Sequence, residues 1–161
     1  MPCPINNLYN LWAVPICDNV KPYEIIEHTA DVGLRIYGRE LPELFTHAGL
    51  GLFGLITDIN KIKQEKGDRR RVSIDLKGRS AGDLLLKWLR ELLFHFSTKR
   101  LVFEKFDYHE LSETVLKADA FGLKFDPKRH DQRYEVKAVT YHQFKLKKQK
   151  SNLSAEIIFD I

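Results

Sequence analysis

Two hydrophobic periods alternate along this chain, and their order limits the folds that it can adopt. Val32, Leu34 and Ile36 alternate with other residues, as in a half-buried strand, and apolar residues then recur at helical spacing over 41–55. A strand pattern at 72–76 and a helical pattern at 80–97 follow, and the remaining segments favour strands: 101–108, 113–124, 134–136, 142–148 and 154–160. This order predicts a single compact α+β domain of two layers, with two helices packed on a mixed, largely antiparallel β-sheet.

The first predicted helix contains residues that normally weaken a helix. Gly49, Gly51 and Gly54 each cost about 1 kcal/mol relative to Ala. We therefore expect them where the helix packs closely against the sheet. Asp58 is expected to end this helix.

The second predicted helix has clearer boundaries. Ser80 is a good N-cap, and Asp83 follows at the third position after it. Lys99 and Arg100 suit the negative end of the helix dipole at the other terminus.

The composition indicates one domain preceded by an extension. A chain of 161 residues has room for one core. Residues 1–21 are rich in Pro and Asn and poor in charge, so we expect an irregular extension there and the domain at 22–161. Both cysteines, Cys3 and Cys17, lie in the extension, where we expect two reduced thiols, although their pairing stays open. The domain itself therefore has no cysteine for a metal site or a nucleophile.

No apolar run approaches the roughly 18–20 residues that cross a bilayer, and the N-terminus is a poor signal peptide. We therefore expect a cytoplasmic protein with no membrane partner. The net charge is +4, and residues 124–150 hold nine Lys and Arg against three Asp and Glu. This basic stretch is either a solvated surface or a weak attractant for RNA or an acidic protein face.

Two acids flank strand-like runs at opposite ends of the domain. Asp31 precedes the first such run, and Asp160 and the terminal Ile161 close the last one, 129 positions later. Only a fold that pairs the first and last strands brings them together. Two carboxylates and a terminal carboxylate would then form an oxygen site for a hard cation such as Ca²⁺ or Mg²⁺. Alternatively, Asp31 caps a turn and Asp160 is an ordinary terminal charge.

Three segments together resemble the signature motifs of the archease family, in that family's order: 23–33 (YEIIEHTADVG), 135–142 (EVKAVTYH) and 158–161 (IFDI). The resemblance implies a non-catalytic activator of the RtcB-type RNA-splicing ligase, which joins tRNA ends through a guanylated histidine. It implies faster guanylation, multiple turnover and broader nucleotide use by that ligase. It also implies a metal site, assigned as calcium in the family, at Asp31, Asp160 and Ile161.

Five further motif residues are candidates for supporting roles. His28 is a poor ligand for calcium, so we expect it to orient Asp31 or nearby backbone, or to be purely structural. Lys137 lies between apolar residues, and the family motif keeps a lysine there, which favours contact with a partner or a phosphate over an ordinary surface charge. Thr140, Tyr141 and His142 continue the motif as supporting residues.

Other readings of the sequence stay open. Asp126, His130 and Asp131 are expected to form a loop, with a metal site as the less favoured alternative. An RNA-binding or chaperone-like module would use the basic stretch 124–150, although no aromatic stacking platform is recognisable there. A metal-dependent hydrolase built on Asp31 and Asp160 would need a general base that no motif supplies. On the activator reading, RNA contact is indirect or weak.

Overall fold

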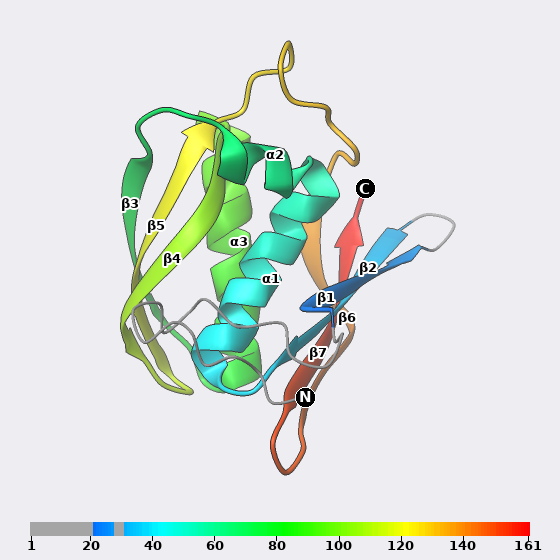
Figure 1. Ribbon diagram of the computed structural model, residues 1–161. Helices are drawn as coiled ribbons and strands as arrows, with labels where there is room; N and C mark the ends of the chain where they lie inside the picture. Colours follow the sequence, from blue (N-terminus) through cyan, green and yellow to red (C-terminus); the bar gives the residue numbers. More distant parts are fainter. Residues whose placement is uncertain (1–20, 28–30) are drawn as a thin grey trace, which may run out of the picture.

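The computed structural model describes residues 21–27 and 31–161 (Figure 1). Its elements are β1 (Tyr23–Glu27), β2 (Asp31–Gly38), α1 (Leu41–Ile56), α2 (Ile59–Gln64), β3 (Arg70–Lys77), α3 (Ala81–Lys99), β4 (Leu101–Leu111), β5 (Val115–Lys124), β6 (Ala138–Lys148) and β7 (Leu153–Asp160). The predicted extension at 1–21, with both cysteines, falls almost wholly outside the described residues, and so does His28.

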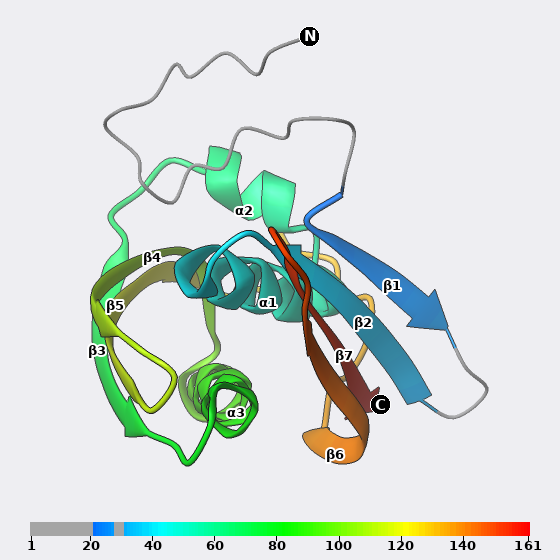
Figure 2. The same ribbon diagram turned by 90° about the horizontal axis from the view of Figure 1, so that it is seen from below.

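The strands form two antiparallel sheets. Sheet A has the order β1-β2-β7-β6 and sheet B the order β3-β5-β4. Figures 1 and 2 show α1 and α3 lying between the two sheets. The predicted α+β class and the two main helices are confirmed, while the strands divide into two sheets instead of forming one.

The composition of α1 explains why a second sheet is needed. Twelve of its 16 residues are buried, so the helix is apolar nearly all round. A helix of this kind must be covered on more than one face. Strands β2 and β4, from different sheets, both pack against it.

The glycines of α1 lie where the helix approaches both sheets, as predicted. A Cβ on Gly49 would lie 2.7 Å from the ring of Phe106 on β4. A Cβ on Gly51 would lie 3.0 Å from Leu34 on β2, and one on Gly54 would lie 2.5 Å from the hydroxyl of Tyr23 on β1. Close packing therefore compensates for the poor helix propensity of these residues.

The predicted start of the second helix is also confirmed. The Ser80 hydroxyl accepts a hydrogen bond from the Asp83 N–H at 3.1 Å, and the Asp83 carboxylate accepts one from the Arg79 N–H at 2.9 Å. One free N–H group of the first turn, that of Asp83, is thereby satisfied, and Asp83 also binds the N–H of the residue before the N-cap. At the other end, Arg100 caps α3 in the left-handed conformation, with φ 58° and ψ 32°.

Two local predictions are corrected by the structure. Helix α1 has Thr57 as its C-cap, and Asp58 instead begins α2 by accepting a hydrogen bond from the Asn60 N–H. The six residues of α2 are too few to show a helical period. Residues 134–136 are not a strand, because the Arg133 and Tyr134 N–H groups donate to carbonyls at the end of α1.

Strand β6 is irregular. Its register with β7 shifts between Thr140 and Lys145, and Gln143 has a positive φ of 54°. It begins at Ala138, four residues before the predicted strand. Within the described part of the chain, no helix is long and apolar enough to cross a membrane.

Candidate functional site

The two predicted acids lie in register in sheet A. Asp31 on β2 pairs with Asp160 on β7, which in turn pairs with Ala138 on β6. The next residues along, Val32 and Phe159, are fully buried in the core. Because side chains alternate across a strand, both carboxylates lie on the face of sheet A that points away from the helices. The strand pairing that would bring Asp31 and Asp160 together is therefore present.

Two polar atoms on this face lack hydrogen bonds. The Oδ1 atom of Asp31 and the Oγ1 atom of Thr140 are buried and have no partner among the described residues. Thr140 pairs with Ile158, two positions from Asp160 on the same face. A buried carboxylate oxygen without a partner is costly, and a bound cation would satisfy it. The oxygens present at Asp31, Asp160 and Ile161 thus fit a hard cation chemically.

Among the described residues, no larger ligand set supports these oxygens. In residues 21–27 and 31–161, no three His, Cys, Asp or Glu side chains gather in a way that could hold a metal ion. A cation at Asp31 and Asp160 would therefore depend on the Ile161 carboxylate, on backbone oxygens and on water for the rest of its shell.

The main chain of Lys137 is fixed beside the end of β7. Its N–H donates to the Asp160 carbonyl at 2.8 Å, and its side chain is exposed. Ile161 packs its side chain partly against the core. His142 is exposed in the irregular part of β6. The structure thus brings Asp31, Asp160 and Lys137 together at one end of the strands of sheet A, whereas no side-chain hydrogen bond or ion pair joins His142 to the acids among the described residues.

Tyr141, the aromatic residue that continues the second motif, is exposed and held by α3. Tyr141 is 56% exposed, and the Arg90 guanidinium of α3 lies 4.2 Å from its ring centroid. Arg90 also donates to the Tyr141 hydroxyl at 2.8 Å. This contact links β6 to α3 beside the candidate site.

Asp126, His130 and Asp131 lie in a loop, as expected. A hydrogen bond from His130 ties this loop to Glu65. His130 Nδ1 accepts a hydrogen bond from the Asp126 N–H at 2.9 Å, so Nε2 carries the proton and donates to Glu65 at 2.6 Å. Arg129 also pairs with Glu65. The hydrogen bond from His130 is the main reason that the pKa of Glu65 lies below its usual value. Glu65 was missed because it lies 65 positions from His130.

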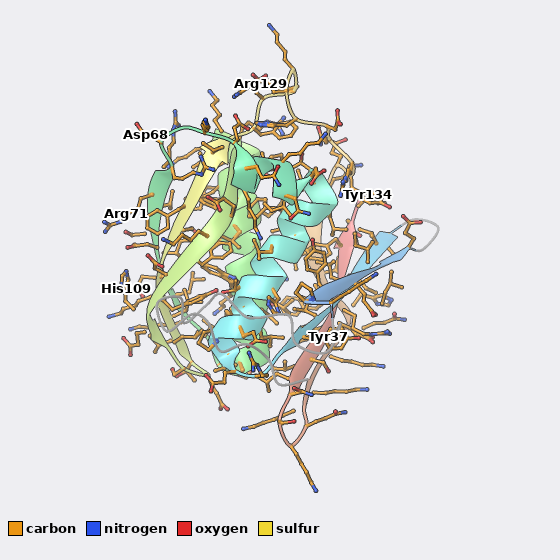
Figure 3. The ribbon with its side chains drawn as sticks, in the orientation of Figure 1. Tyr37, Asp68, Arg71, His109, Arg129 and Tyr134 are labelled. Carbon is orange, nitrogen blue, oxygen red and sulfur yellow. The ribbon has the colours of Figure 1, made fainter. Side chains whose placement is uncertain are left out.

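A second polar cluster lies on the outer face of sheet B. The Asp119 carboxylate accepts hydrogen bonds from the Ser73 hydroxyl at 2.8 Å and from His109 Nε2 at 2.9 Å. These bonds, that from His109 first, hold the pKa of Asp119 below its usual value. Figure 3 shows His109 and Arg71, which pairs with Asp119, on the outer side of this sheet. Ser73 donates to a carboxylate and not to a histidine, so the cluster does not have the arrangement of an activated nucleophile.

The sequence matches the Archease protein family (MTH1598/TM1083) over residues 23–161. The chain belongs to the archease family. Among archease relatives, the protein from Sulfurisphaera tokodaii is 37% identical over 144 residues, which cover 88% of this chain and all of that protein. The archease of Pyrococcus abyssi is 40% identical over 133 residues, covering 80% of this chain and 90% of the relative.

Solved archease-type structures share this fold. The solution structure of Methanobacterium thermoautotrophicum protein 1598 matches with a TM-score of 0.69 and 34% identity, over 88% of this chain and all of that one. A Thermotoga maritima archease, described as a possible chaperone, matches with a TM-score of 0.57 and 21% identity, over 84% of this chain and 94% of that one. At that identity the second match supports the archease fold alone.

Proposed function

We propose that this protein activates an RtcB-type RNA-splicing ligase in tRNA splicing, by promoting guanylation of the ligase and its multiple turnover. Membership of the archease family supports this function. The activator acts on the ligase and does not itself join RNA. The ligase is its main partner, and any contact with RNA is indirect or weak.

The observation that carries the proposal is the in-register pairing of Asp31 with Asp160. The pairing places two acids on one face of sheet A, and one of their oxygens is buried without a partner. Acids that served only to cap a turn or end a chain would not require this convergence. We propose that Asp31, Asp160 and the Ile161 carboxylate hold Ca²⁺, for which Mg²⁺ could substitute.

Lys137 gives the site a second kind of contact. A cation held by the acids, with the ammonium of Lys137 nearby, would present positive charge to a docked ligase. Divalent ions stabilise charge that develops on nucleotide phosphates during transfer. In this scheme Asp31 and Asp160 position the ion, Lys137 contacts the ligase or a phosphate, and Thr140 and His142 shape the surrounding surface.

A single-turnover guanylation assay of a cognate ligase, run under limiting divalent metal, tests this function. We expect the wild-type protein to accelerate guanylation strongly. Asp160→Asn and Lys137→Ala should each lose most of that acceleration. The matched control is Asp75→Asn, which removes an exposed carboxylate from sheet B and should accelerate guanylation like the wild type. Full acceleration by folded Asp160→Asn would contradict a role for the metal, and no acceleration by the wild type would contradict the function itself.

The second candidate is an RNA-binding or chaperone-like module. Lys145, Lys147 and Lys148 are exposed on β6, the outer strand of sheet A, and they belong to the basic stretch 124–150. Binding to bulk RNA without any ligase, falling steeply with salt, would favour this candidate.

A further inference from the structure

A cleft adjoins the candidate site, and among its lining residues only Lys137 has a role in the function proposed above. It has a volume of about 690 Å³ and lies between the last turn of α3 and residues 132–137. Pockets that hold small molecules usually measure roughly 300–1,000 Å³, so the cleft is large enough for a nucleotide-sized ligand. Lys137 lines it and also bonds to Asp160, so the cleft adjoins the end of β7.

The wall formed by 132–137 is held in place although it belongs to no sheet. The Arg133 N–H donates to the Ile56 carbonyl at 2.8 Å, and the Tyr134 N–H donates to the Leu55 carbonyl at 3.1 Å. Val136 is buried in the core, and the Lys137 N–H is bound to β7. A ligand would therefore meet a formed wall, which lowers the entropy cost of binding.

The opposite wall is also rigid. The ring of Phe96 packs edge-on against Phe125, with 5.7 Å between centroids. The Arg100 guanidinium lies 5.2 Å from the Phe96 ring. Arg100 is thus directed along the wall by an aromatic contact.

The charges that line the cleft are strongly unbalanced. Arg100, Arg133 and Lys137 are cations, and Glu135 is the one acid among the lining residues. Arg133 pairs with Asp58 outside the lining at a long 3.6 Å and keeps 51% of its side chain exposed. Within the described residues, no ion pair is recorded for Arg100 or Lys137. A cleft lined mainly by positive charges concentrates anions.

The backbone of Arg100 gives a separate indication. Its φ of 58° falls in the left-handed region, where the residue that ends a helix is usually Gly or Asn. Arginine adopts this conformation at a cost in free energy that glycine does not incur. A backbone strained in this way points toward a use for the side chain.

We propose that this cleft binds a phosphate group, with Arg100, Arg133 and Lys137 supplying the positive charge and the Ser97 hydroxyl a further donor. Guanidinium groups match the geometry of phosphate oxygens, and an ammonium adds a compact point charge. The phosphate belongs either to a free nucleotide or to the end of an RNA strand. Because the binding is a property of this chain alone, it does not depend on activation of a ligase.

Isothermal titration calorimetry of the full chain tests this inference. The ligands are pyrophosphate, GTP, and a short single-stranded RNA with or without a terminal phosphate. We expect salt-sensitive binding of pyrophosphate. Tighter binding of GTP than of the RNA would identify a nucleotide as the source, and RNA binding that requires the terminal phosphate would identify an RNA end.

Arg100→Gly separates binding from structure. It removes the cation and relieves the backbone, so the melting temperature should stay the same or rise while pyrophosphate affinity falls at least about tenfold. Lys137→Ala should lose affinity similarly. Arg70→Ala removes the same charge from an exposed position on β3 and should bind within about twofold of the wild type. Absence of binding by the wild type at millimolar ligand, or unchanged binding by Arg100→Gly and Lys137→Ala, would overturn the proposal.

Discussion

The N–H of Lys137 donates a hydrogen bond to the carbonyl oxygen of Asp160 at 2.8 Å, one residue before the paired part of β6 begins. This bond fixes a lysine and an acid, through their main chains, at the same end of the strands of sheet A. The side chains of both residues are therefore exposed at a position that the backbone determines. Cation binding and phosphate binding can then be tested separately, because the acids and the cleft cations belong to neighbouring but different residues.

Calcium should stabilise the folded protein through the acids. At a free concentration about 100 times its Kd, a ligand that binds only the folded state adds about 2.7 kcal/mol. Thermal unfolding with Ca²⁺ and with a chelator should show this increase for the wild type and for Asp75→Asn. Asp31→Asn and Asp160→Asn should lose it.

The same variants carry an internal check. In chelator, Asp31→Asn should be neutral or stabilising, because it removes the charge of a carboxylate that has one buried oxygen without a partner and so relieves repulsion from Asp160. A full calcium shift in both variants would contradict the assignment of the site.

Glu65→Gln should destabilise the protein at neutral pH but not in acid. The hydrogen bond from His130 lowers the pKa of Glu65 in the folded state. A lowered pKa contributes stability above the ordinary Glu value, and this contribution is lost as the pH falls through the folded value. The melting temperatures of the variant and the wild type should therefore differ at pH 7 and converge below the ordinary value of 4.5.

The control for that comparison is Glu113→Gln, at an exposed position between β4 and β5. It should melt close to the wild type at every pH. A gap between Glu65→Gln and the wild type that stays constant into acid would show that the Glu65 charge is not what stabilises the loop.

Gly49→Ala should destabilise the core although alanine is the better helix former. The new Cβ would lie 2.7 Å from the buried ring of Phe106. Overpacking costs about 1–3 kcal/mol and helix propensity returns about 1 kcal/mol, so we expect a net loss of up to about 2 kcal/mol in urea unfolding. Gly54→Ala should cost less, because its Cβ meets the far end of the Tyr23 side chain. Equal losses in the two variants would contradict this explanation.

Tyr134→Phe should loosen the segment that walls the cleft. The Tyr134 hydroxyl donates to the Glu27 carboxylate on β1, and this hydrogen bond is the main cause of a raised pKa for Tyr134. Without it, we expect faster hydrogen exchange at the Arg133 and Tyr134 amides. The Ile157 amide, in the fully buried part of β7, serves as the internal control. Unchanged exchange at Arg133 and Tyr134 would show that the main-chain bonds alone hold the segment.

The sequence predicted those features that depend on local pattern or on an ordered set of motifs. The α+β class, the Ser80 cap and the packed glycines of α1 followed from periodicity and propensity. A metal site at Asp31 and Asp160 required their two strands to pair, and they do.

The missed features depend on contacts between distant segments. Periodicity shows which face of a strand is buried, but not which sheet the strand joins, so the division into two sheets was not predicted. The sequence signal that could have indicated it is that α1 is apolar nearly all round, which requires cover on more than one face. The partnership of Glu65 with His130 and the cleft between α3 and 132–137 arise only when the loop docks on α1.

The place of β7 in sheet A also affects how the protein is made. This strand is the last in the chain, yet it lies between β2 and β6 and pairs with both. While a ribosome is still producing residues 153–160, β6 has no neighbour in the sheet and β2 has only β1. Sheet A is therefore complete only once β7 has emerged, and copies truncated before residue 153 would expose two unpaired edges that are prone to aggregate. Asp31 and Asp160 meet only when β7 inserts between β2 and β6, so the candidate site forms together with that strand pairing.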